Sequence, residues 1–175
     1  MTLHSLFDQR RRKELQAALK MGDLGPVLGK RKPVPDVVAP ARTSEEQEEL
    51  NRALRFAADK GDTRTVEELI SKGADLNGKD NTGLTALICA ARNGYTETAE
   101  MLISKGADVN AKDNDGWMAL MYAAGIGFTA TIEKLIYLGA DVNAKDNNGE
   151  TALKCAVKNG NTETAEMLKR HGATE

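Results

Sequence analysis

The sequence repeats with a period of 33 residues, and this period constrains the fold more than any other feature of the chain. A fixed period of this length is typical of a solenoid, in which each unit buries its apolar face only against its neighbours. Three sets of glycines recur on this step: Gly83, Gly116 and Gly149; Gly94, Gly127 and Gly160; and Gly73, Gly106, Gly139 and Gly172. We therefore expect an elongated stack of units, with function on its long surface.

Within one period, the residue types predict two helices and the loops that join them. In the segment 113–116, Asp and Asn side chains bond to nearby backbone and Gly accepts a positive φ, which favours a hairpin-like finger loop. A short first helix with the small pair Ala123-Ala124 follows, and Gly127 ends it. The second helix carries an apolar stripe over 132–136, and Gly139 suits a left-handed helix C-cap.

These units resemble ankyrin repeats over roughly residues 45–175. The run from Asp113 to Asn143 carries the resemblance through its turn, its apolar positions and its glycines. The units depart from the family's Thr-Pro-Leu-His opening, because Thr85, Met118 and Thr151 are each followed by Ala-Leu and then by Ile, Met or Lys. The resemblance implies an all-α solenoid of helix-turn-helix units with β-hairpin-like fingers. It also implies that partners bind along the concave side, at finger tips and first helices.

The chain divides into a basic N-terminal segment, residues 1–43, and a repeat region, residues 44–175. In the first segment we predict a short helix over about 5–21, followed by a Pro-containing linker. Three alternatives stay open for this segment: a helix ordered by a partner, a degenerate fifth layer, or a strap that blocks the binding groove. The predicted repeats cover about 44–81, 82–114, 115–147 and 148–175.

The first and last units are modified in ways that suit the ends of a stack. The run Ser44-Glu45-Glu46-Gln47 is interpreted as a capping box that starts a longer, polar first helix toward Lys60. Leu50 stands at the position of the finger glycine. The last unit has Lys169 where the second has Ile103. Because a solenoid needs a wettable outer face at each end, we expect a finished four-unit stack.

The net charge of −2 is unevenly distributed along the chain. Residues 1–42 hold nine Lys and Arg against four Asp and Glu, a net charge of +5. Residues 43–175 hold 15 against 22, a net charge of −7. This asymmetry predicts a basic arm beside an acidic body.

Two cysteines, Cys89 and Cys155, occupy the same position in units two apart. Layers at this separation hold the two thiols too far apart for a disulfide, so we expect reduced, core-lining cysteines. Reduced thiols favour a cytoplasmic protein, and the basic runs leave a nuclear location open. Neither a signal peptide nor a membrane span is indicated by the apolar runs.

The sequence predicts no catalytic, cofactor or metal site, and hence no enzyme. His4 and His171 lie at opposite ends of the chain, and the two cysteines fall in separate layers, which does not suit a four-ligand metal site. No phosphate-binding Gly-rich loop or nucleophile motif is present in the sequence. The recurring Asp80, Asp113 and Asp146 are interpreted as turn formers rather than general acids.

The informative residues are those that break the repeat at surface positions. Trp117 follows the turn glycine, where its counterparts are Leu84 and Glu150, and a Glu there argues for solvent exposure. We therefore expect an exposed Trp117, flanked by Met121 and Ile126, to act as an interface anchor, with packing between layers as the alternative. Local repacking is favoured for Met118, Tyr122 and Phe128. The predicted partner-binding residues are Leu84, Arg92, Tyr95, Asp115, Trp117, Met121, Ile126, Glu150 and Lys158.

These features favour a non-catalytic protein–protein interaction module that acts as a monomer unless the N-terminal segment mediates association. Its partner is a protein of unknown identity. The basic runs 10–13 and 30–32 support an alternative, a nucleic-acid-associated or inhibitory regulator that uses the basic arm with the stack as scaffold. No aromatic residues interleave these runs, which weakens the case for single-strand recognition. Solvated charge, an acidic partner and anionic lipid are the other interpretations of the same runs.

Overall fold

The computed structural model describes residues 42–174, and within this range the chain forms helices and loops without a strand. The predicted helix over 5–21 and the Pro-containing linker lie outside the described residues. The eight described helices are α2 (Ser44–Lys60), α3 (Thr63–Ser71), α4 (Ala86–Arg92), α5 (Thr96–Ser104), α6 (Ala119–Ile126), α7 (Thr129–Tyr137), α8 (Ala152–Lys158) and α9 (Thr162–Arg170). The predicted all-α repeat stack is confirmed.

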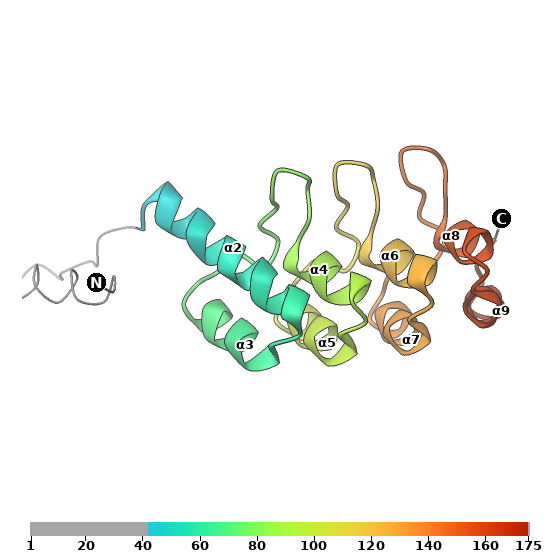
Figure 1. Ribbon diagram of the computed structural model, residues 1–175, viewed down its shortest axis with the longest axis horizontal. Coiled ribbons are helices and arrows are strands. Elements are labelled where there is room, and N and C mark those ends of the chain that lie inside the picture. The colour runs from blue at the N-terminus through green and yellow to red at the C-terminus, as the bar shows by residue number, and fades with distance from the viewer. Residues whose placement is uncertain (1–41, 175) are drawn as a thin grey trace, which may run out of the picture. The chain divides into compact units, whose positions relative to one another are not determined.

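The helices form two parallel rows (Figure 1). The first helices α2, α4, α6 and α8 pack side by side, and the second helices α3, α5, α7 and α9 form the row beneath them. Three loops, residues 72–85, 105–118 and 138–151, connect one pair to the next and project on the side of the first helices (Figure 1). We call these loops finger 1, finger 2 and finger 3.

The core lies between the two rows and is built from residues that keep the 33-residue register. Leu54, Leu87, Leu120 and Leu153 from the first helices are buried, as are Leu102, Leu135 and Leu168 from the second helices. Alanines such as Ala91 and Ala124 are also fully buried on the first helices. Because their side chains are small, neighbouring first helices approach closely, as the sequence predicts.

Helix α2 begins one residue earlier than the sequence suggested. The N-cap is Thr43, whose Oγ1 accepts a hydrogen bond of 3.1 Å from the amide of Glu46. The Glu46 carboxylate in turn accepts one of 2.9 Å from the amide of Thr43. The predicted capping box at Ser44 is therefore wrong by one position, because the reciprocal glutamate stands three residues after Thr43. The helix continues to Lys60, as predicted, and ends at Gly61 in the left-handed conformation.

Recurring aspartates hold the base of each finger. Oδ1 of Asp80 accepts hydrogen bonds from the amides of Thr82 (2.8 Å) and Leu84 (2.9 Å). Asp113 and Asp146 accept the equivalent pairs of amide bonds in fingers 2 and 3. The interpretation of these aspartates as turn formers is confirmed.

Side-chain hydrogen bonds between successive units join the layers. The hydroxyls of Thr63 and Thr98 share a hydrogen bond of 2.8 Å on the side of the second helices. On the finger side, Nδ2 of Asn114 donates to the Asn81 carbonyl (2.9 Å), and Nδ2 of Asn147 donates to the Asn114 carbonyl (3.0 Å). These bonds fix the spacing of neighbouring fingers.

Both cysteines are unpaired and buried, as predicted. Burial raises the pKa of the Cys89 thiol to about 11, and the Arg92 guanidinium opposes this shift only in part. A thiol with a raised pKa stays protonated at neutral pH, so Cys89 serves as a small apolar core residue.

Candidate functional site

The residues that break the repeat gather on one surface, which we call the finger face. It consists of the fingers, the first helices and the junctions between the helices of each pair. Leu84, Trp117 and Glu150 take the same place at the ends of fingers 1, 2 and 3, and all three are partly buried. Asp115 lies exposed on finger 2. The finger face therefore carries an apolar side chain, an aromatic one and an acidic one at one repeated position.

Trp117 is half-buried, and the expectation that it stands exposed is corrected. The centroid of its ring lies 5.1 Å from the centroid of the Tyr122 ring, and the two ring planes are tilted by 56°. Tyr122 occupies the position held by Cys89 and Cys155 in the neighbouring units, and its larger ring gives the indole a packing partner on α6. Trp117 therefore presents one part of its ring to solvent and packs with the other.

Tyr122 is anchored through its hydroxyl, which donates a hydrogen bond of 2.6 Å to Oδ2 of Asp113. Burial raises the pKa of Tyr122, and the hydrogen bond to the Asp113 carboxylate raises it further. The hydroxyl therefore stays protonated and continues to donate. This bond links the first helix α6 to the base of finger 2.

The equivalent carboxylate in finger 3 has no such donor. Within residues 42–174, Oδ2 of Asp146 is buried without a hydrogen-bond partner. Burial by itself would raise the pKa of Asp146, but the hydrogen bonds from the amides of Glu150 and Asn148 hold it below its usual value. Asp146 therefore stays ionised.

Met121 is buried and Ile126 is exposed, although the sequence analysis placed both beside Trp117 on the surface. Met121 is 1% exposed and packs in the core between layers, so its side chain is not available on the finger face and its prediction as a contact residue is corrected. Ile126 lies one helical turn further on and is 54% exposed. On α6, Ile126 is therefore the apolar side chain that faces solvent.

Two of the ion pairs on the finger face involve predicted contact residues. Arg92 donates to Oδ1 of Asp59 at 2.7 Å, which joins α4 to α2. This hydrogen bond is the main cause that lowers the pKa of Asp59. In the last pair, Nζ of Lys158 lies 2.7 Å from the Glu150 carboxylate, and this contact raises the pKa of the lysine. Three of the four predicted charged contact residues, Arg92, Glu150 and Lys158, are thus ion-paired with one another or with α2, and Asp115 is exposed.

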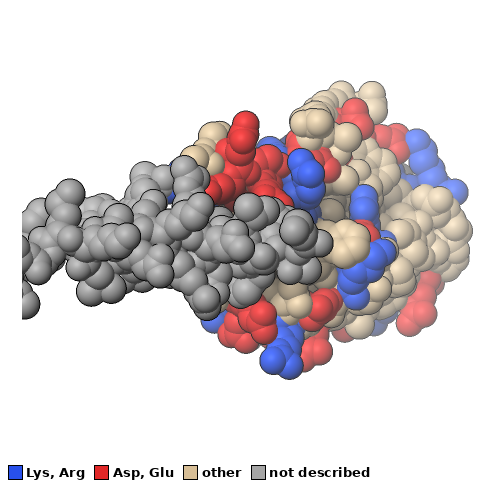
Figure 2. Space-filling view, turned by 60° about the vertical axis from the view of Figure 1, so that its left-hand side comes forward, with Lys and Arg blue, Asp and Glu red and all other residues tan. Residues whose placement is uncertain are grey.

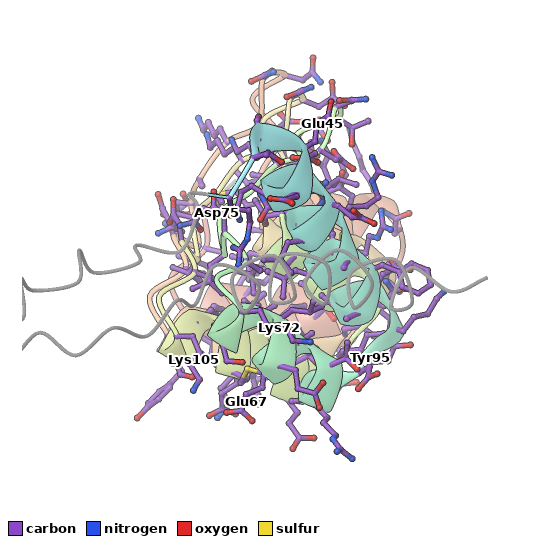
Figure 3. All side chains as sticks on the ribbon, turned by 90° about the vertical axis from the view of Figure 1, so that its left-hand side faces the viewer. Glu45, Glu67, Lys72, Asp75, Tyr95 and Lys105 are labelled. Atoms are coloured by element: carbon purple, nitrogen blue, oxygen red, sulfur yellow. The ribbon has the colours of Figure 1, made fainter. Side chains whose placement is uncertain are left out.

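Tyr95 lies at the edge of the finger face. It stands at the junction of α4 and α5, is 38% exposed, and its ring packs directly over Gly61. In Figure 3, Tyr95 and Glu45 lie at opposite ends of α2. A partner that contacts the fingers would reach Tyr95 only by extending across the first helices.

The structure adds one surface feature that the sequence analysis missed, a hollow of about 530 Å³ between α2 and finger 1. Phe56 lines it and is 65% exposed, whereas its counterpart Cys89 is buried. The sequence feature that could have indicated this hollow is Phe56, because two other units have a cysteine at the same position. The lining residues are Glu48, Arg52, Arg55, Phe56, Asp59, Lys79, Asp80, Asn81, Leu84, Cys89 and Arg92.

The described residues offer no candidate for metal chemistry: over 42–174, no group of three His, Cys, Asp or Glu side chains is placed to hold an ion. Within the same range, no helix has the length and apolar character to cross a membrane. Lys and Arg alternate with Asp and Glu on the face shown in Figure 2, and neither sign covers it.

The fold and the finger face define a helical repeat protein with a long, loop-edged surface. The model of the ankyrin repeats, which describes three copies, matches residues 37–113 and 110–174, and the chain belongs to the ankyrin repeat family. Ankyrin repeats are generally protein–protein interaction modules and are typically non-catalytic. Among curated proteins, none matches this chain.

Proposed function

We propose that this protein is a non-catalytic interaction module that binds a protein partner on the finger face. The observation that supports this proposal most directly is the apolar cluster on finger 2 and α6. There, the half-buried Trp117 packs at a tilt against Tyr122 of α6, and the solvent-exposed Ile126 also lies on α6. Aromatic anchors surrounded by apolar and charged neighbours are typical of the residues that dominate interface energies.

The fingers are held in position before any partner arrives. Asparagine side chains bond each finger to the next, and Nζ of Lys79 donates to the Lys112 carbonyl at 2.8 Å. The amide of Asn114 also donates to the Thr82 carbonyl at 3.1 Å. Because these loops are already ordered, little conformational entropy is lost on association.

The proposed contact surface runs along the finger face from α4 to α8. Met121 supports it from the core without reaching the partner. Arg92 and Lys158, although ion-paired, remain accessible enough to bond to a partner. The proposed contact residues are Leu84, Arg92, Tyr95, Asp115, Trp117, Ile126, Glu150 and Lys158.

A pull-down from cell extract with the full chain and matched variants tests this proposal. Ile126→Ala and Trp117→Ala should each reduce capture of the same protein, with affinity falling by about tenfold for the tryptophan. Tyr137→Ala is the control, because Tyr137 is 83% exposed but lies on the second helix α7. Urea denaturation measures the stability of each variant, because Trp117 also packs against Tyr122 and its removal can destabilise the fold.

The result that contradicts the proposal is capture that depends on Tyr137 and not on Ile126 or Trp117. That result would move the contact surface to the second helices. Equal loss of stability and of capture in Trp117→Ala, with Ile126→Ala unchanged, would make Trp117 a packing residue.

A further inference from the structure

The hollow between α2 and finger 1 exists because the first helix of the stack differs from the others. In the later units a finger precedes a short first helix, whereas residues 44–52, at the positions that belong to finger loops in those units, are already part of the 17-residue helix α2. Along its side, Phe56 exposes most of its ring, and Leu84 of finger 1 lies on the opposite wall, partly buried. The hollow therefore combines an apolar part, to which Phe56 and Leu84 contribute, with a lining that is otherwise mostly charged or polar.

Two of the three acidic side chains that line the hollow are ion-paired, and the third, Asp80, is held by hydrogen bonds within its own finger. Glu48 accepts a hydrogen bond of 2.8 Å from Arg55, and Asp59 accepts one of 2.7 Å from Arg92. Asp80 accepts hydrogen bonds from amide groups of its own finger. Burial by itself would raise the pKa of Asp80, but the hydrogen bonds from the Thr82 side chain and the Leu84 amide outweigh burial and hold the pKa below its usual value. Asp80 therefore stays ionised, and the lining of the hollow holds four basic side chains against three acidic ones.

Two cations of the hollow lack a matching anion. Arg52 is exposed, and within residues 42–174 no acidic side chain lies within 4.0 Å of its guanidinium. Lys79 is exposed and donates to the Lys112 carbonyl, which is a neutral acceptor, so its charge is uncompensated. The ammonium of Lys60 adds positive charge 5.6 Å from the Phe56 ring centroid, although it also contacts Asp59 at 3.5 Å.

The rest of the described stack carries its acidic charge elsewhere. The first helices α4, α6 and α8 contain Arg92, Lys154 and Lys158 and no acidic residue. Glutamates occur instead on the second helices, and Figure 3 shows Glu67 on the side of the stack away from Glu45. An anionic segment that lies on α4, α6 and α8 therefore meets no acidic side chain of these helices, whereas α2 carries Glu45, Glu46, Glu48, Glu49 and Asp59.

We infer that the hollow binds an extended acidic peptide segment of the partner. An apolar side chain of this segment packs between Phe56 and Leu84, and its Asp or Glu carboxylates pair with Arg52 and Lys79. This inference rests on the proposed function and specifies the chemistry of the partner at one end of the finger face. The same charges disfavour the chain's own basic run 10–13 as the occupant.

The test is selection from a random 12-residue displayed peptide library with the full chain as bait. We expect enrichment of sequences in which Asp or Glu flank a Leu, Ile or Phe. Binding of the most enriched synthetic peptide, measured by fluorescence polarisation, should weaken by about tenfold in Phe56→Ala and in Arg52→Glu. It should also weaken as salt is raised.

The matched control is Arg64→Glu, which makes the same charge change on an exposed arginine of the second helix α3. It should leave peptide affinity within about twofold of wild type. Arg52→Gln separates loss of the cation from the added repulsion, and circular dichroism confirms that each variant folds. Both Phe56 and Arg52 are exposed, so neither substitution removes a core contact.

Three results overturn the inference: no peptide is selected, the selected peptides lack acidic residues, or Arg64→Glu weakens binding as much as Arg52→Glu. The proposed function is tested separately. If Trp117→Ala and Ile126→Ala abolish partner capture while Phe56→Ala and Arg52→Glu do not, the finger face binds a partner but the hollow does not contribute.

Discussion

The hydroxyl of Tyr122 donates to Oδ2 of Asp113 at 2.6 Å, and no equivalent bond is made in the other described units, where Phe56, Cys89 and Cys155 stand at the tyrosine position. Tyr122→Phe removes this donor and leaves a largely buried carboxylate oxygen without it. We expect a loss of about 1–3 kcal/mol in the free energy of unfolding, measured by urea denaturation. Tyr95→Phe is the control, because over residues 42–174 the Tyr95 hydroxyl makes no hydrogen bond. Equal effects of the two substitutions would contradict this prediction.

Gly83 and Gly149 have similar backbone conformations, with φ of 85° and 76°, but different surroundings. A Cβ at Gly83 would lie 2.6 Å from the backbone nitrogen of Asn114, whereas one at Gly149 would meet nothing within 4 Å. Ala at either position carries the strain of the left-handed region, about 1–2 kcal/mol. We expect Gly83→Ala to lower the melting temperature clearly more than Gly149→Ala. Identical shifts would mean that close approach of the fingers is unimportant.

Ala124 and Val157 occupy the same position of successive first helices, yet Ala124 is 0% exposed and Val157 is 58% exposed. The next layer covers Ala124, and none of the described residues covers Val157 in that way. Ala124→Val should therefore overpack the interface and cost about 1–3 kcal/mol of unfolding free energy. Val157→Ala should change it by less than about 0.5 kcal/mol. Guanidinium denaturation of both variants measures the contrast, and a neutral Ala124→Val would show that the layers can separate to admit a larger side chain.

Acid should destabilise the stack through carboxylates such as Asp59. The hydrogen bond from Arg92 holds the folded-state pKa of Asp59 below the unfolded value of about 3.9. The stabilisation is therefore fully present above about pH 5 and is lost as the pH falls through the folded-state pKa. We expect the free energy of unfolding to fall below about pH 4, and to fall less steeply in Asp59→Asn.

The control for this pH dependence is Asp115→Asn, which removes an exposed carboxylate of finger 2 without removing an ion pair. Urea denaturation between about pH 7 and pH 3 compares the three proteins. If Asp59→Asn retains the full wild-type slope, the Arg92–Asp59 pair does not contribute to acid sensitivity.

Local signals were sufficient to predict much of the fold. Asp80 bonds to amides two and four residues away, and α2 is started by a cap three residues from its partner glutamate. Such interactions join residues only a few positions apart in the sequence, so the residue types are sufficient to predict them. The capping box was misplaced by one position because Thr43 and Ser44 are both good N-caps, and only the observed hydrogen bonds distinguish them.

The candidate site was predicted less well, because exposure depends on neighbours in other layers. The equivalence of Trp117 with Glu150 suggested an exposed indole, but Tyr122 supplies a ring that packs against it. Met121 was grouped with the surface, and the adjoining layers bury it. Phe56 was overlooked, since a phenylalanine in a helix is more often a core residue.

The 33-residue sequence period by itself determined the family, the all-α stack and the turn at the base of each finger. The reason is that the same turn residues, apolar positions and glycines recur in successive units. The tertiary structure decided which non-repeating side chains meet solvent. In the folded protein Met121 is buried, Trp117 packs against Tyr122, and Phe56 is exposed to solvent beside finger 1. The physical reason is that exposure is set by atoms from adjoining layers, about one period away along the chain, whose contacts no local pattern encodes.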